Sequence, residues 1–243
     1  EPLNVTSENR VILGVSDKDI LPQLRTQYTD TIQTRLKSLM GRAITVEVHV
    51  SPGRARGPGW LNPRYSFDRF VISTSNQMAL MACEAVASQP GRTNPLYLYV
   101  ESGLGKTHLI HSLANDMLER TPALSICYTS FEDLRDQFQQ SLASKQTLEF
   151  KNLYRRYDVL IIEDIQYLKP AGQTLQEEFF HIFNHYYENS KQIVLSSERP
   201  ASELTVSSRL MSRLLAGLQV RIEAPDPVLR ESIVEKRSAE MGL

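Results

Sequence analysis

Leu96-Tyr-Leu-Tyr-Val-Glu-Ser-Gly-Leu-Gly-Lys-Thr-His-Leu-Ile110 is the stretch around which the rest of the chain is arranged. It places an apolar strand, a glycine turn and a helix start in direct succession, as a phosphate-binding loop does. Gly103 and Gly105 let main-chain N–H groups close on an anion. Lys106 can reach the terminal phosphates, and the Thr107 hydroxyl can hold a magnesium ion. This stretch therefore predicts a site for a nucleoside triphosphate.

The loop departs from the full pattern G-x-x-x-x-G-K-[ST] at its first position, which is Val100, and an acid, Glu101, follows. A β-branched residue restricts a turn in which glycine is usual, and a carboxylate repels phosphate groups. The sequence alone leaves open whether the stretch from Val100 to Ser102 permits ATP binding.

Length, composition and charge limit the possible number of domains, the location and the mode of nucleic-acid binding. The 243 residues are 41% hydrophobic and 23% charged, which predicts one full domain and a smaller one. There is no run of 18 apolar residues and no charged-then-apolar signal segment, so a cytoplasmic protein is expected. A net charge of −1 means that any nucleic-acid binding depends on a local surface. Because the sequence begins without methionine, we expect a fragment.

The first fifty residues predict a small α+β unit. A strand is expected at residues 10–15, a capped helix begins near Ser16 and ends at Gly41, and residues 44–50 alternate as a half-buried strand does. Residues 51–60 hold several glycines and prolines and are predicted to be a linker. The predicted domains are therefore 1–50, the linker 51–60 and a larger domain over 61–243.

The larger domain alternates helix and strand, which is typical of an α/β fold with a parallel sheet. Five strands are expected, at residues 96–100, 125–128, 159–162, 192–196 and 219–222. Helices are expected at residues 76–87, 106–120, 131–144, 148–155, 175–189, 207–214 and 227–241.

Two acids, Glu163 and Asp164, follow the fully apolar strand at 159–162. Ligands of parallel sheets bind at the carboxyl ends of strands, so the glycine loop and the acid pair can meet at one site. A hydroxyl and one carboxylate can hold magnesium there, and a second carboxylate can orient water.

Several motifs together resemble the DnaA family of bacterial chromosomal replication initiators, from Leu61 almost to the C-terminus. They are Leu61 to Val71, Asn94-Pro95-Leu96, Gly103 to Leu109, Glu163 to Leu168, Gln176 to His181 and Ser196 to Pro200. The resemblance implies an AAA+ P-loop ATPase core that binds ATP or ADP with Mg²⁺, is a weak ATPase if its loop is competent, oligomerises on origin DNA and opens the strands. It also makes residues 1–50 similar to the C-terminal half of the family's N-terminal interaction domain.

The resemblance implies roles for single residues. Glu163 matches the magnesium-side acid, where the family usually has Asp, and Asp164 matches the catalytic acid. Glu198 matches the sensor after the fourth strand, and Arg213 matches the arginine finger that reaches the nucleotide of a neighbouring subunit. The stretch from Phe67 to Val71 matches the segment near the base.

Partners are also implied by the resemblance. Residues 131–156 match an insertion that the family uses on single-stranded DNA, with Lys151, Arg155 and Arg156 at its basic end. The N-terminal unit implies contact with the replicative helicase or regulators, and acidic phospholipid is a further possible contact. The sequence ends at Leu243, so we expect the family's lid and the C-terminal helix-turn-helix that reads duplex DNA to lie outside it.

Two alternatives stay open at this point. A helicase loader or transposition-helper ATPase shares Gly-x-Gly-Lys-Thr-His, although the N-terminal unit and Phe179-Phe180-His181 argue against it. A DnaA-like interaction module with a decayed, non-catalytic site is favoured by Val100 and Glu101.

Overall fold

The structure is a computed structural model that describes residues 2–5, 10–15, 28–40, 45–50, 61–101 and 103–241. The chain divides into two compact units, Glu1–Ala55 and Arg56–Leu243, which are described separately below.

The smaller unit contains a three-stranded sheet and a helix. Its elements are β1 (Pro2–Val5), β2 (Arg10–Val15), α2 (Thr29–Met40) and β3 (Thr45–Val50). Strand β2 pairs parallel with β3 and antiparallel with β1. The two predicted strands are confirmed, whereas β1 was not predicted, because four residues are too few to show a period. The predicted helix start near Ser16 and the linker at 51–60 lie outside the described residues.

The larger unit is built on the predicted five-stranded parallel sheet. Its strands are β4 (Leu96–Tyr99), β5 (Ile126–Ser130), β6 (Val159–Glu163), β7 (Gln192–Ser197) and β8 (Leu218–Arg221). They lie in the order β5-β6-β7-β4-β8, and every pair is parallel. The α/β prediction is thus confirmed, with strand bounds within two residues of those expected.

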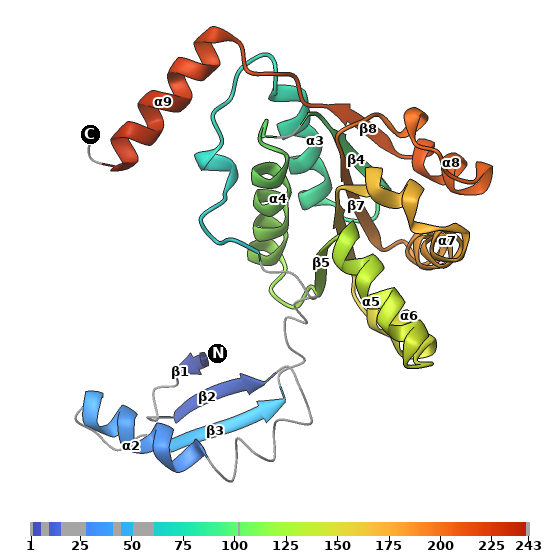
Figure 1. Cartoon of the computed structure of the whole chain (residues 1–243). Coiled ribbons are helices and arrows are strands. Elements are labelled where there is room, and N and C mark those ends of the chain that lie inside the picture. Colours follow the sequence, from blue (N-terminus) through green and yellow to red (C-terminus); the bar gives the residue numbers. More distant parts are fainter. Residues whose placement is uncertain are drawn as a thin grey trace. The chain divides into compact units, whose positions relative to one another are not determined.

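Helices cover both faces of this sheet (Figure 1). The helices are α3 (Gln77–Ser88), α4 (Lys106–Arg120), α5 (Phe131–Ala143), α6 (Thr147–Arg155), α7 (Gln173–Glu188), α8 (Ser208–Leu215) and α9 (Pro227–Met241). Short 3₁₀ turns at Phe67–Arg69, Ile165–Ala171 and Ala201–Glu203 were not predicted. Helices α3 and α4 lie on one face, and α7 lies on the other with α5 and α6 beside it.

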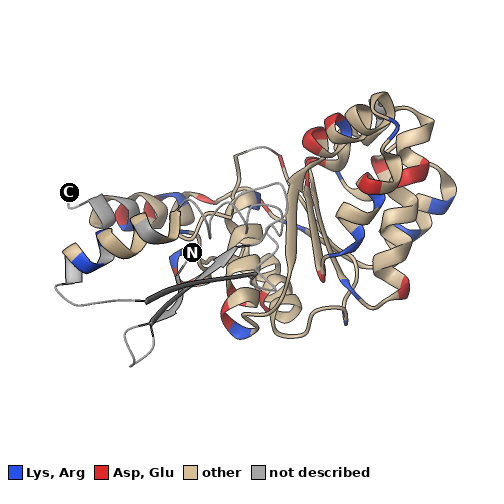
Figure 2. Ribbon diagram, turned by 90° about the horizontal axis from the view of Figure 1, so that it is seen from below, with Lys and Arg blue, Asp and Glu red and all other residues tan. Residues whose placement is uncertain are grey.

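The strands form the centre of the core because their residues are almost all uncharged. Figure 2 shows acidic and basic residues interspersed along the helices, whereas the strands between them are mostly tan. Every residue of β6 and β7 is buried, as expected for strands covered on both faces. Within the described ranges, no helix is both long and apolar enough to span a bilayer.

Strand order brings two predicted motifs to one edge of the sheet. Strand β7 pairs with β4 on one side and with β6 on the other. Because all three strands are parallel, their carboxyl ends lie at the same edge. The loop after β4 and the acids at the end of β6 are therefore separated by a single strand.

Candidate nucleotide site

The glycines of the loop are needed for its backbone. Gly103 has a φ of 82° and Gly105 a φ of 94°, and Gly105 directly precedes α4. Residues that carry a side chain rarely adopt such positive φ angles, which explains why glycine occupies both positions. A Cβ added at Gly103 would meet nothing within 4 Å, and one at Gly105 would lie 3.4 Å from the Phe70 ring. The loop thus leaves an open space in front of the N-terminus of α4, where main-chain N–H groups attract anions.

Val100 does not restrict the turn as expected, because it directly follows strand β4 and precedes the turn. Its N–H donates to the Ser197 carbonyl at 3.1 Å, which continues the pairing of β4 with β7 by one residue. Its φ is not positive, so glycine is not needed there. The side chain is buried in the core with Leu98 and Val194, away from solvent. The expectation was wrong because the turn begins after Val100; Glu101, the next residue, is exposed.

Lys106 is folded back onto the loop. Its Nζ donates to the Val100 carbonyl at 2.6 Å and lies 3.5 Å from the Glu101 carbonyl. The side chain is buried, with 7% of its surface exposed. These main-chain carbonyls satisfy the buried amine of Lys106 and hold it inside the loop, next to the space where an anion would bind.

The Thr107 hydroxyl and the Glu163 carboxylate, which were predicted to share a magnesium ion, are in direct contact. Thr107 Oγ1 donates to Glu163 Oε2 at 2.9 Å, and Tyr128 Oη donates to Glu163 Oε1 at 2.8 Å. Burial raises the pKa of Glu163, and the hydrogen bonds from Tyr128 and Thr107 oppose that rise. Hydroxyl and carboxylate oxygens are the ligands that Mg²⁺ prefers, so this pair fits the ion.

Asp164 is held in an unusual backbone conformation next to this pair. Its φ of 61° and ψ of 46° are left-handed, which Asp tolerates better than most residues and which often marks functional sites. Its N–H donates to Ser196 Oγ at 3.4 Å, and its Oδ1 accepts from Gln166 Nε2 at 3.2 Å. Gln166 Oε1 in turn accepts from the N–H of Glu198, at 3.2 Å. Gln166 therefore joins the candidate catalytic acid to the exposed candidate sensor.

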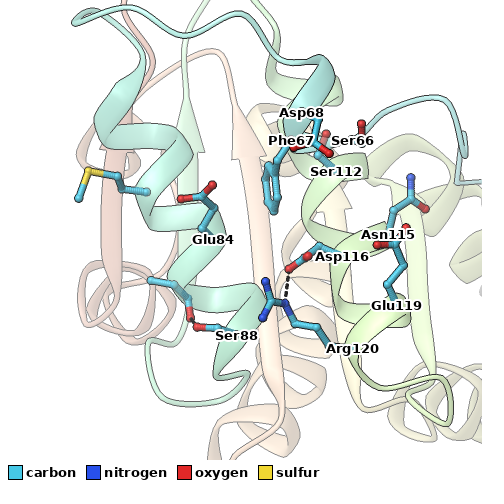
Figure 3. A pocket seen from close by; sticks show the side chains of 12 residues that line it. Ser66, Phe67, Asp68, Glu84, Ser88, Ser112, Asn115, Asp116, Glu119 and Arg120 are labelled. Carbon is cyan, nitrogen blue, oxygen red and sulfur yellow. Dashed lines mark hydrogen bonds and ion pairs between the residues drawn. The ribbon is translucent and has the colours of Figure 1, made fainter.

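An apolar hollow of about 250 Å³ adjoins the glycines. Its lining is mostly apolar and includes Arg69, Phe70, Val71, Asn76, Gly103, Gly105, His108, Ile222, Glu223, Leu229 and Ile233. The last three residues of the predicted base segment therefore line this hollow. Phe67 lines a separate hollow of about 530 Å³ between α3 and α4, shown in Figure 3 with Glu84 and Asp116. That second hollow is lined by Phe67 and Asp68 of the predicted base segment but by no residue of the glycine loop or of the acid pair.

Comparison with known proteins decides the family. The model of the bacterial DnaA ATPase domain matches residues 61–221. The chain belongs to this DnaA family. A chromosomal replication initiator protein DnaA from Roseiflexus castenholzii is 44% identical over 189 residues, which are 77% of this chain and 39% of the relative. The chain thus covers about two fifths of that relative's length.

Solved DnaA structures share the fold of the larger unit. Domain III of the Thermotoga maritima replication initiation protein DnaA is 36% identical, with a TM-score of 0.72, and the match covers 76% of this chain and 77% of that one. A replication initiator DnaA bound to AMPPCP and single-stranded DNA is 34% identical, with a TM-score of 0.70 over 76% of this chain and 57% of that one. The predicted AAA+ core is therefore confirmed.

The arginine that matches the DnaA finger lies apart from the loop of its own chain. Arg213, on α8, donates from Nε to Asn184 Oδ1 at 3.1 Å, and its guanidinium carbon lies 4.5 Å from the centre of the Tyr187 ring. Both partners belong to α7. The structure therefore does not bring Arg213 together with the other predicted catalytic residue, Asp164.

The basic residues predicted for the DNA-binding insertion do not form one surface. Lys151 makes an ion pair with Glu178 of α7, at 2.9 Å. Arg155 lies one turn further along the same face of α6, and its Nε is buried without a hydrogen-bond partner among the described residues. Only Arg156 is exposed, and it donates to the Tyr157 hydroxyl at 2.8 Å. Lys151 therefore lies on the face of α6 that contacts α7, and a DNA-binding role for the three basic residues stays a prediction.

Two residues of the DnaA-family site were missed in the sequence. Tyr128 contacts Glu163 from the neighbouring strand, and Gln166 bridges Asp164 to Glu198. Gln166 could have been found from its place two residues after the acid pair. Tyr128 gave no local signal, since only strand pairing brings it to the site.

Proposed function

We propose that this chain is the ATP-binding core of a replication initiator, which binds ATP or ADP with Mg²⁺, oligomerises on origin DNA and promotes strand opening. The observation that carries the proposal is the contact between Thr107 and Glu163 beside an open glycine loop. The AMPPCP and single-stranded DNA bound to a DnaA relative of the same fold support it.

Each predicted residue has a task in this proposal. Lys106 and the loop N–H groups neutralise the phosphates, while Phe70 and Val71 bound the space for the base. Thr107 and Glu163 would hold the magnesium ion, which would supply charge neutralisation at the phosphates. The roles of Asp164 in orienting water and of Glu198 in sensing the nucleotide are those that the family resemblance implies, and the hydrogen bonds of Gln166 to both residues support them.

Arg213 suits a role in a neighbouring subunit. It is held on α8 and α7, and an arginine there cannot serve the loop of its own chain without leaving Asn184 and Tyr187. Self-association would place it at a second subunit's nucleotide, where a cation stabilises transferring phosphate. ATP hydrolysis should then depend on protein concentration, and Arg213→Ala should remove that dependence while ATP affinity stays unchanged.

Single-stranded DNA is proposed to contact the surface of α5 and α6. A hollow of about 920 Å³ there is lined mainly by amide and hydroxyl side chains, and its charged residues are Arg156 and Glu149. Amides suit phosphate and sugar contacts without sequence preference. Arg156→Ala should reduce the slope of log affinity against log salt by about 0.7, the value for one lost phosphate contact. An unchanged slope would remove Arg156 from the DNA surface.

Nucleotide binding tests the central proposal. A fluorescent ATP analogue should bind the full chain in Mg²⁺, and Lys106→Ala should weaken binding roughly 10- to 100-fold by removing a charge-assisted contact. Lys191→Ala is the matched control, because Lys191 Nζ also donates to two main-chain carbonyls, those of Arg155 and Tyr157, but away from the loop. Equal effects of the two substitutions, or no binding by the unmodified chain, would contradict an ATP site.

The second candidate is a DnaA-family interaction module without nucleotide. The exposed carboxylate of Glu101 in the loop favours this module, because it would repel phosphate. Val100 no longer favours it, because its side chain is buried in the core and does not distort the loop. Family membership argues against a helicase loader or transposition helper. The family resemblance also leads us to propose contacts with the helicase or regulators through residues 1–50, with duplex DNA through a further domain and with acidic phospholipid. A cytoplasmic location is proposed on the same basis.

A further inference from the structure

The Glu163 carboxylate is fixed at both of its oxygens. One oxygen accepts from Thr107 in the phosphate loop, at 2.9 Å, and the other accepts from the Tyr128 hydroxyl, at 2.8 Å. Only 6% of Glu163 is exposed, so a carboxylate there depends on these donors. Tyr128 belongs to none of the motifs that predict the nucleotide site.

Strand register explains how Tyr128 reaches Glu163. Tyr128 on β5 pairs with Ile161 on β6. Side chains two residues apart on a strand lie on the same face, so Glu163 projects beside Tyr128. Both are on the face that α4 covers, since Tyr128 packs against the core cluster that contains Ile161 and the buried residues of α4. The contact is therefore set by the backbone of the sheet and not by a mobile loop.

His111 of α4 packs against the Tyr128 ring. The two ring centres are 4.7 Å apart with an edge-to-face angle of 76°. His111 follows Thr107 by one helical turn, so one face of α4 presents both residues towards the sheet. The Nδ1 atom of His111 accepts the N–H of Asn62 at 2.8 Å, which fixes the imidazole. Tyr128 is consequently held between a helix and the acid that it contacts.

A glutamate needs such a restraint more than an aspartate does. Its side chain has one more rotatable bond, so ordering it costs more conformational entropy. A hydroxyl can present a lone pair to a cation and still donate its proton, so Thr107 can keep its bond to Glu163 while holding Mg²⁺. Tyr128 occupies the other oxygen and so decides how the carboxylate faces the loop. Partners of this kind typically change metal affinity 10- to 100-fold.

We propose that Tyr128 is a positioning residue for Glu163, whose hydroxyl orients the carboxylate towards Thr107 and thereby gives nucleotide binding its dependence on divalent cation. This inference rests on the proposed ATP site. It concerns the Mg²⁺-dependent part of the affinity, because neither Tyr128 nor Glu163 lines the apolar hollow beside the glycines.

The test compares ATP binding by the full chain in excess Mg²⁺ and in EDTA. Tyr128→Phe keeps the ring and its packing on His111 but removes the hydroxyl. It should lower the affinity in Mg²⁺ about tenfold and leave the affinity in EDTA within about twofold. Tyr154→Phe is the matched control, because its hydroxyl also donates to a side chain, Gln137 Oε1, but on α5. It should change neither affinity.

A double-mutant cycle separates positioning from general stability. In a Glu163→Asp background the shorter acid should lose the contact with Tyr128, so adding Tyr128→Phe should then have no further effect on Mg²⁺-dependent binding. An equal loss in Mg²⁺ and EDTA, additive effects of the two substitutions, or no change in Tyr128→Phe would each overturn the positioning role. If the unmodified chain binds no ATP in either condition, the proposed function fails and this inference fails with it.

Discussion

Substituting Val100 by glycine restores the first glycine of the phosphate-loop pattern, and the structure predicts that this change damages the protein. Val100 is 6% exposed and packs in the core beneath α3 and α4. Removing its three side-chain carbons costs about 2 kcal/mol from lost burial and the cavity left behind. A glycine in an extended, paired position adds about 1 kcal/mol of backbone entropy. Val100→Gly should therefore lower the free energy of unfolding by about 3 kcal/mol.

Thermal and urea unfolding measure this loss directly. For a unit of this size, about 3 kcal/mol corresponds to a fall in Tm of roughly 6 to 12 °C. Affinity for ATP should not rise, because Val100 already has a φ that requires no glycine. Glu101→Gly next to it is the control for added flexibility, since an exposed position should lose about 1 kcal/mol or less. A stable Val100→Gly variant with tenfold tighter ATP binding would refute this reasoning.

Three further predictions follow from contacts of single side chains. Glu101→Gln removes an exposed negative charge from the loop, so titration should show ATP binding about fivefold tighter in low salt. The gain in affinity should be smaller in high salt, which screens the charge. Weaker ATP binding by this variant would contradict the prediction. Lys151→Met leaves Glu178 nearly buried without its cation and should cost about 1 to 3 kcal/mol in urea unfolding, and adding Glu178→Gln should recover much of it. Burial lowers the pKa of His111 from 6.5 to about 4. As the pH falls, His111 therefore takes up a proton in the unfolded chain before it does so in the folded chain. Stability should fall by roughly 1 to 2 kcal/mol between pH 7 and pH 5, and His111→Gln should flatten that slope.

Much of the site could be read from local patterns because its residues are neighbours in the chain. Gly103 to Thr107 form one turn, and their task follows from glycine conformation and helix capping, which act over a few residues. Asp164 was found because it follows a fully apolar strand. By contrast, the role of Val100 depended on whether β4 continues to pair with β7, and no local pattern carries that information. The same holds for Lys151, whose side of α6 is determined by its packing on α7.

The sequence by itself determined the alternation of strand and helix, the parallel sheet, the family and the residues of the loop and acid pair, because periodicity and turn chemistry are local. Tertiary structure decided the strand order β5-β6-β7-β4-β8, and with it the meeting of Thr107 and Glu163 across β7. It also supplied Tyr128, which reaches Glu163 only because β5 pairs with β6 in one register. Hydrogen bonds between strands join residues that lie far apart in the chain, so these contacts exist only once the sheet has formed.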